Sequence, residues 1–239
     1  SLTNAAVEDF IGLCNQAIHT RGLFAVSLSG GSTPEPFYRA LAEPAQRSRV
    51  DWRHVHLFWG DERPVPPDHS DSNFLMVKEV MIDSVGIPAA NINRVPAEMD
   101  VRLAAFSYEE ELRDFFADEW PRFDLVLLGM GEDGHTASLF PKSAGLNEEQ
   151  RWFIANFAPD RQTWRLTLTK HAINAARKIW VLVRGEPKAE KLAEVLSGRE
   201  EPWENPIQLV HPVEGTLTWW IDEAAAQKLP EEIKRHNEP

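Results

Sequence analysis

The segment 123–141, FDLVLLGMGEDGHTASLFP, constrains the fold of this chain more than any other part of the sequence. An apolar run typical of a buried strand leads into a glycine-rich loop that carries Asp133 and His135 and ends at Pro141. In an α/β protein, ligands bind in the crevice outside the carboxyl ends of the strands, where loops and helix N-termini collect. We therefore expect the chemistry of this chain at this loop.

Strand-like and helical patterns alternate along most of the chain, which predicts an α/β fold with a mostly parallel sheet covered by helices on both faces. At 239 residues and 43% hydrophobic content, the chain suits one domain, 1–239. The expected helices lie between Asn4 and Gly22, from 34 to 41, and in 72–82, 100–119 and 187–198. The expected strands of this sheet are 24–29, 55–60, 92–95, 123–128, 178–185 and 216–222.

One part of the chain departs from this alternation. The strand-like runs 152–157 and 164–169 have no helix between them and are joined by Ala158-Pro159-Asp160. Such a pair predicts a small antiparallel excursion, which we expect to form a flap beside the site.

Composition and charge exclude several classes of function. The net charge of −12 repels a phosphate backbone, so we expect no nucleic-acid partner. Cys14 is the single cysteine, which excludes an internal disulfide framework and suits a reducing cytosol. No apolar run approaches the length of a membrane span, and we expect a cytoplasmic protein without a membrane partner. The sequence begins at Ser1 rather than at a methionine, so the question of a preceding N-terminal segment, such as a targeting segment, is left open.

A second glycine-rich turn, Ser29-Gly30-Gly31-Ser32-Thr33-Pro34, joins an expected strand to an expected helix. Glycines let backbone N–H groups approach an anion, and the two hydroxyls add further donors. The turn predicts a phosphate cradle. The alternative is an ordinary strand-to-helix turn with Thr33 as the N-cap residue.

The loop after residue 128 matches the dinucleotide fingerprint G-x-G-x-x-G, but Pro141 follows too soon for the long crossover helix which that fingerprint needs. A histidine that activates water fits better, because histidine titrates near neutral pH and Asp133 can orient the His135 ring. The alternative is a loop histidine that only caps the following turn.

Other polar residues at strand ends are candidates for substrate binding. Arg63 can bind a carboxylate or phosphate, and Asp61 can accept a hydrogen bond from a sugar hydroxyl. Arg165 and Lys188 suit an anionic group, although single charges of this kind are often only solvated. No metal-ligand pattern emerges: His54 and His56 share a strand face, but no third ligand completes a set.

Taken together, five segments in this order resemble the 6-phosphogluconolactonase family, covering about 23–196. The segments are SLSGGSTPEPFYRAL, FWGDERPVPPDHSDSNFLM, FDLVLLGMGEDGHTASLFP, WRLTLT and VRGEPKAEKLAEVL. The resemblance implies a Rossmann-like fold and hydrolysis of 6-phospho-D-glucono-1,5-lactone to 6-phosphogluconate in the pentose phosphate pathway. It implies no metal, covalent intermediate or organic cofactor. The expected partner is this sugar phosphate lactone, and we expect a monomer, with a homodimer left open.

The resemblance also assigns roles to the candidate residues. His135 is expected to act as a general base on water and then as a general acid, with Asp133 holding it and Arg63 near the developing oxyanion. The 6-phosphate is expected on the turn formed by Gly30, Gly31, Ser32 and Thr33, with charge from Lys188 in preference to Arg165.

Two rival functions stay open at this point. The deaminase/isomerase branch of the superfamily shares the GxGxDGH pattern, but it places a glutamate just before the proline that ends the loop, where this chain has Phe140. A non-catalytic sugar-phosphate sensor would keep the cradle and lose the base, whereas both Asp133 and His135 are present. The acidic run Glu109 to Glu111 is interpreted as solvated surface.

Overall fold

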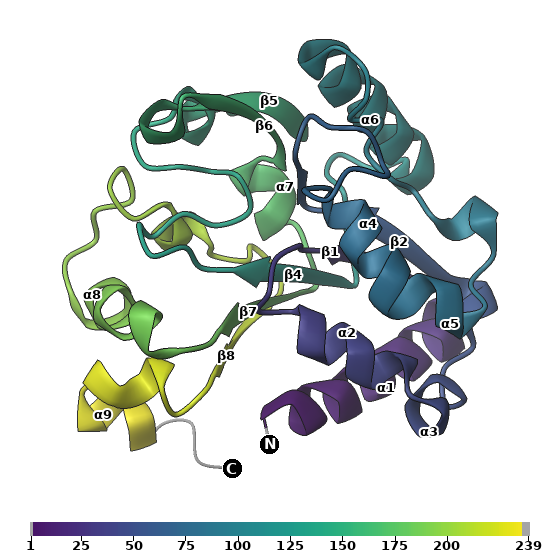
Figure 1. The fold of residues 1–239 in the computed structure, drawn as a ribbon, viewed down its shortest axis with the longest axis horizontal. Coiled ribbons are helices and arrows are strands. Elements are labelled where there is room, and N and C mark those ends of the chain that lie inside the picture. The colour runs from purple at the N-terminus through teal and green to yellow at the C-terminus, as the bar shows by residue number, and fades with distance from the viewer. Residues whose placement is uncertain (1, 236–239) are drawn as a thin grey trace.

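Five parallel strands form the central sheet of the structure, a computed structural model that describes residues 2–235 (Figure 1). The expected α/β architecture is confirmed. The strands, in the spatial order β2-β1-β4-β7-β8, are β2 (Val55–Trp59), β1 (Phe24–Leu28), β4 (Leu125–Gly129), β7 (Lys178–Val183) and β8 (Thr216–Ile221). The helices are α1 (Leu2–Arg21), α2 (Glu35–Ala42), α3 (Pro44–Arg47), α4 (Asn73–Val77), α5 (Asp83–Val85), α6 (Val101–Phe116), α7 (Lys170–Asn174), α8 (Ala189–Ser197) and α9 (Glu231–Arg235).

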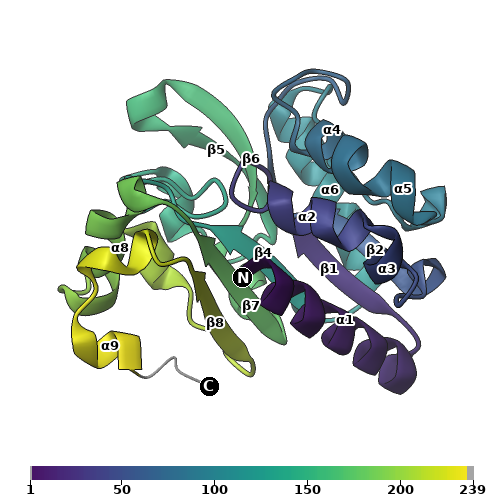
Figure 2. The same cartoon turned by 60° about the horizontal axis from the view of Figure 1, so that its bottom comes forward.

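Helices cover both faces of this sheet (Figure 2). On one face, Phe10 of α1 packs edge-on against Phe24 of β1, with ring centroids 5.3 Å apart. On the other face, Phe58 of β2 contacts Phe115 of α6 at 4.9 Å. Phe24 is paired with Val55, three residues before Phe58, so the two phenylalanines point to opposite sides of the sheet. A strand sequence that is apolar at every position is therefore buried on both sides.

The antiparallel excursion is also confirmed, and it is part of a second, three-stranded sheet. The order is β3-β6-β5, where β3 is Asp61–Glu62, β5 is Phe153–Ala158 and β6 is Thr163–Leu168. Asp61 is paired with Thr167, so β3 attaches the excursion directly to the segment that follows β2. The turn Pro159–Arg161 forms the tip of the β5–β6 hairpin.

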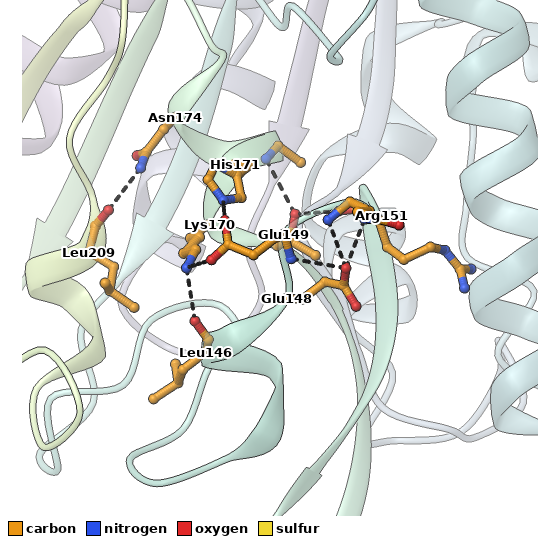
Figure 3. A network of polar contacts seen from close by, with 11 residues as sticks. Leu146, Glu148, Glu149, Arg151, Lys170, His171, Asn174 and Leu209 are labelled. Carbon is orange, nitrogen blue, oxygen red and sulfur yellow. Dashed lines mark hydrogen bonds and ion pairs between the residues drawn. The ribbon is translucent and has the colours of Figure 1, made fainter.

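A polar network connects this second sheet to α7 (Figure 3). Glu149 accepts hydrogen bonds from Lys170 and from Nε2 of His171, the latter at 2.7 Å. Thr169 caps α7 by accepting from the N–H of Ala172, and its hydroxyl donates to the carbonyl of Arg151 at 2.7 Å. The sequence patterns did not predict α7, because a helix of one turn is too short to show periodicity.

Three further expectations need correction. Residues 92–95 form no strand: only Ile92 makes an isolated bridge to Leu57, while the Asn91 amide donates to backbone carbonyls at 2.9 and 3.0 Å. The helix expected over 72–82 is divided into α4 and a π-helical stretch, 78–82. Glu109 is not solvated surface, because it is buried and binds Arg113, Arg151 and the N–H of Trp152. A buried carboxylate satisfied by three donors stabilises the attachment of α6 to β5.

The side on which the chain adds its next strand changes at the middle of the central sheet. From β1 the chain continues to β2 on one side, whereas from β4 it continues to β7 and β8 on the other. The carboxyl ends of β1 and β4 therefore form the topological switch point, where loops diverge and leave a crevice. The glycine turn 29–34 follows β1, and the loop 130–141 follows β4. The fold thus brings the two glycine-rich segments together.

Candidate active site

A cavity of about 450 Å³ opens at this switch point. Its walls come from the turn after β1, the segment after β2, the loop after β4, the tip of the β5–β6 hairpin and the segment after β7. The lining residues are Ser29, Gly30, Gly31, Ser32, Thr33, Pro34, Asp61, Arg63, Asn73, Gly129, Met130, Gly131, Glu132, His135, Ala137, Arg161 and Lys188. Most of the residues proposed from the sequence are therefore in one place, although 158 positions separate Gly30 from Lys188.

The loop after β4 brings Asp133 and His135 into direct contact. Nδ1 of His135 hydrogen-bonds to Oδ1 of Asp133, and the backbone N–H of His135 donates to the same oxygen at 3.2 Å. Gly131 has to be glycine, because a Cβ there would lie 2.0 Å from Nδ1 of His135. With Nδ1 engaged by the carboxylate, Nε2 of His135 is left to exchange a proton with a group in the cavity.

Charge around Asp133 keeps this carboxylate ionised. Partial burial raises its pKa, but the hydrogen bond and charge of His135, together with the charge of Arg161, outweigh burial and hold the pKa well below its ordinary value. Nη2 of Arg161 lies 3.2 Å from Oδ2 of Asp133. The carboxylate therefore acts as a fixed negative charge that orients the imidazole ring.

The turn after β1 presents backbone donors to the cavity. Within residues 2–235, the N–H groups of Gly30, Gly31, Ser32 and Thr33 donate no hydrogen bond. Gly31 has φ +89°, and a Cβ on Gly30 would lie 1.8 Å from Oδ1 of Asn73. Helix α2 begins at Glu35 with Pro34 at its N-cap position and no side-chain cap, so Thr33 is not the N-cap. Free donors at a helix start are what a phosphate requires.

The segment after β2 is held rigidly by buried polar contacts. Oδ2 of Asp61 accepts from the Ser138 hydroxyl at 2.7 Å, and the Asn73 amide donates to the Asp61 carbonyl at 2.9 Å. Glu62 is buried and accepts from the N–H groups of Arg63 and Asn73. Burial raises the pKa of Glu62, and its backbone hydrogen bonds oppose that rise. Asp61 and the Arg63 side chain, whose Nη1 donates to the Asp71 carbonyl at 2.7 Å, both line the cavity.

The two cations proposed from the sequence are placed differently. Lys188 lines the cavity, with its Nζ 3.7 Å from Oε1 of Glu132. Arg165 is not among the lining residues: its Nη1 donates to Oγ1 of Thr163 and to the carbonyl of Trp164, both at 3.0 Å. Burial lowers the pKa of Arg165, and the nearby charge of Arg63 lowers it further. Its role in binding stays a prediction.

Arg161 and Asn73 are among the lining residues that were not proposed from the sequence. Arg161 reaches the cavity from the hairpin tip, which is far along the chain from the β4 loop. Asn73 lies at the start of α4 and supports Gly30 from behind. For Asn73 the SN pair in the motif that follows GDER was a usable signal, whereas nothing around Arg161 distinguishes it from a surface arginine. No group of three or more potential metal ligands occurs in the part of the chain that the structure describes.

Comparison with known proteins now adds to this geometry. Residues 1–219 match the family model described as glucosamine-6-phosphate isomerases/6-phosphogluconolactonase. The chain belongs to this family. It is 43% identical over 218 residues to a 6-phosphogluconolactonase of Synechocystis, a match that covers 90% of this chain and 88% of the relative. A 6-phosphogluconolactonase of Mycobacterium tuberculosis is 36% identical over 237 residues, which is 96% of this chain and 94% of the relative.

Solved structures of family members share the fold. The crystal structure of 6-phosphogluconolactonase from Thermotoga maritima superimposes with a TM-score of 0.79 at 31% identity, covering 92% of this chain and 94% of that one. The structure of 6-phosphogluconolactonase from Trypanosoma brucei gives a TM-score of 0.81 at 26% identity and covers 96% and 95% of the two chains. The Rossmann-like architecture implied by the sequence resemblance is thereby confirmed.

Proposed function

We propose that this chain hydrolyses 6-phospho-D-glucono-1,5-lactone to 6-phosphogluconate. The observation that carries the proposal is the Asp133–His135 pair beside a cavity that is also lined by a turn of free backbone N–H groups. Relatives that match nearly the full length of the chain are named for this activity. A sugar phosphate lactone has an anionic end for the turn and an electrophilic carbonyl for the histidine.

Substrate binding begins with the phosphate. The N–H groups of Gly30, Gly31, Ser32 and Thr33 are the donors that would bind its oxygens, and Lys188 supplies charge. Arg63 and Lys188 are the lining cations that would face an anion, because the guanidinium of Arg161 is bound to Asp133. Asp61 is oriented by Ser138 to accept a hydrogen bond from a sugar hydroxyl. Holding both ends of the substrate positions the carbonyl for attack.

Hydrolysis then proceeds through proton transfers at His135. Nε2 accepts a proton from a water molecule as the water oxygen bonds to the lactone carbonyl carbon, and the carbonyl oxygen becomes an oxyanion. The bond from this carbon to the ring oxygen breaks, and the imidazolium returns its proton to that oxygen. The products are a free hydroxyl and a carboxylic acid that ionises. Asp133 stabilises the imidazolium between the two transfers, and Arg63 stabilises the oxyanion.

All the residues in this scheme come from one chain, so we expect a monomer to be active. The test is the rate of hydrolysis of freshly generated 6-phospho-D-glucono-1,5-lactone by the wild type and by His135→Ala, with spontaneous hydrolysis subtracted. We expect the substitution to reduce kcat by a factor of about 10² to 10⁴. No acceleration by the wild type would contradict the proposal, and turnover of glucosamine 6-phosphate instead would assign the chain to the deaminase branch.

A further inference from the structure

Arg161 and Phe140 complete a closed set of contacts around the Asp133–His135 pair. The Phe140 ring lies 4.7 Å from the His135 ring, centroid to centroid, at an interplanar angle of 30°. The guanidinium carbon of Arg161 lies 4.9 Å from the centroid of Phe140, and Nη2 of the same side chain contacts Asp133. Each of the four side chains therefore touches two of the others.

We propose that Arg161 and Phe140 are positioning residues for the proton transfers at His135. This inference rests on the function proposed above and adds two residues that act through the pair rather than on the substrate. Phe140 is buried and limits rotation of the imidazole ring, while Arg161 occupies the Asp133 oxygen that His135 does not use. A carboxylate held at both oxygens keeps the imidazole in one orientation.

The β5–β6 hairpin determines where Arg161 meets Asp133. Arg161 is the last residue of the hairpin turn, and Gln162 after it has φ +50°, a left-handed conformation that reverses the chain at this point. The same hairpin pairs with Asp61 through β6. The position of the hairpin therefore sets the position of Arg161, and through it the orientation of the catalytic pair.

The identity of residue 140 also separates this chain from the deaminase pattern. A carboxylate at position 140 would face the Arg161 guanidinium and compete with Asp133 for it. Phenylalanine instead offers a ring face, which attracts the guanidinium without engaging its donors. Arg161 is thus left to bind Asp133.

The test compares Arg161→Gln and Arg161→Lys with the wild type in steady-state lactone hydrolysis. We expect Arg161→Gln to lower kcat by about three- to tenfold with KM nearly unchanged, and Arg161→Lys to recover at least half of the loss. Arg102→Gln is the matched control. The guanidinium carbon of Arg102, on α6, lies 5.8 Å from the centroid of the Trp164 ring, which belongs to the same hairpin as Arg161, and Arg102 does not line the cavity. This control variant should retain wild-type kcat.

A pH profile separates positioning from general loosening of the hairpin. The charged groups around His135 are Asp133 and Glu132 from its own loop, Arg161 from the hairpin, Asp61 and Arg63 after β2, and Lys188 after β7. Removing the Arg161 cation favours protonation of the Asp133–His135 pair. The acid limb of the pH profile of kcat/KM should therefore move to higher pH in Arg161→Gln.

Phe140→Leu provides an independent arm through a double-mutant cycle. We expect the effects of Phe140→Leu and Arg161→Gln on kcat to be non-additive, because both act on one contact set. A rise in KM with kcat unchanged, an equal loss in Arg102→Gln, or additive effects with an unmoved acid limb would each overturn the inference. If the wild type itself did not accelerate lactone hydrolysis, the proposed function would fail, which is a different outcome.

Discussion

His135 and His171 each pair with a carboxylate and border a cavity, and of these two cavities only the one beside His135 suits a sugar phosphate. His135 binds Asp133 through Nδ1 on the loop after β4. His171, on α7, binds Glu149 through Nε2 (Figure 3). This second pair is more exposed: the side chains of His171 and Glu149 are 37% and 62% exposed, whereas those of His135 and Asp133 are 20% and 40% exposed. The pairing itself therefore does not identify a catalytic residue.

The surroundings of the two pairs differ in charge. His171 borders a cavity of about 260 Å³ whose charged walls are Asp118, Glu119, Glu214 and Arg122, and Arg122 is already paired with Glu214 at 3.0 Å. Acidic walls repel a phosphate, whereas the cavity beside His135 offers Arg63, Lys188 and a turn of free N–H groups. Chemistry requires a base together with a place that holds the substrate against it.

The largest difference is expected when each histidine is removed. His171→Ala should leave kcat for lactone hydrolysis within about twofold of the wild type. For His135→Ala we expect kcat to fall by a factor of about 10² or more. The measurement is kcat for both variants at equal concentration, with circular dichroism as a check of folding. Equal losses in the two variants would mean that the comparison between the pairs is wrong.

A methyl group added to the phosphate turn should have the next largest effect. Gly30→Ala places a Cβ 1.8 Å from Oδ1 of Asn73, so either the Asn73 side chain leaves Asp61 or the turn moves, and we expect the N–H groups to lose their alignment. We expect kcat/KM to fall by about tenfold to a hundredfold. Gly12→Ala is the control, since nothing lies within 4 Å of its added Cβ; it should leave hydrolysis unchanged. Unaltered kinetics in Gly30→Ala would contradict the cradle.

Removing one lysine beside each histidine should give a smaller difference. Lys188→Gln takes a cation from the cavity wall and should raise KM for the lactone about five- to tenfold, and the effect should weaken with added salt. Lys170→Gln removes a partner of Glu149 and should leave KM unchanged. Initial rates at low and high ionic strength measure both. A KM for Lys188→Gln that equals the wild-type value would remove this residue from the phosphate site.

The smallest effect is expected in acid stability. Burial raises the pKa of Asp133, but its contacts with His135 and Arg161 lower the pKa by more, so the net pKa is lowered in the folded protein. The ionised carboxylate therefore stabilises the fold at pH values above its ordinary pKa, and this contribution is lost as the pH falls. Because Asp133 is substantially exposed, we expect less than about 1 kcal/mol. Urea unfolding at neutral and acidic pH should show a weaker pH dependence for Asp133→Asn than for the wild type. The pKa of Glu149 is also lowered, by Lys170 and His171, but its side chain is more exposed, so Glu149→Gln should change the pH dependence less than Asp133→Asn.

The sequence alone was sufficient for the fold class and for the two glycine-rich segments that meet at the candidate site. The apolar strands show as continuous runs because both of their faces are buried, and glycines mark the turns where a side chain would collide, as Gly30 and Gly131 show. These signals are local, so they can be read without knowing what lies across the sheet.

Contacts between distant segments were decided only by the tertiary structure. Glu109 looked like surface until α6 placed it against Arg151, and Arg161 looked like any loop arginine until the hairpin placed it against Asp133. Arg165, which was proposed beside Lys188, donates to its own strand and does not line the cavity. A side chain's charge and size are written in the sequence, but its neighbours depend on how strands pair and helices pack, and those neighbours determine its protonation and its role.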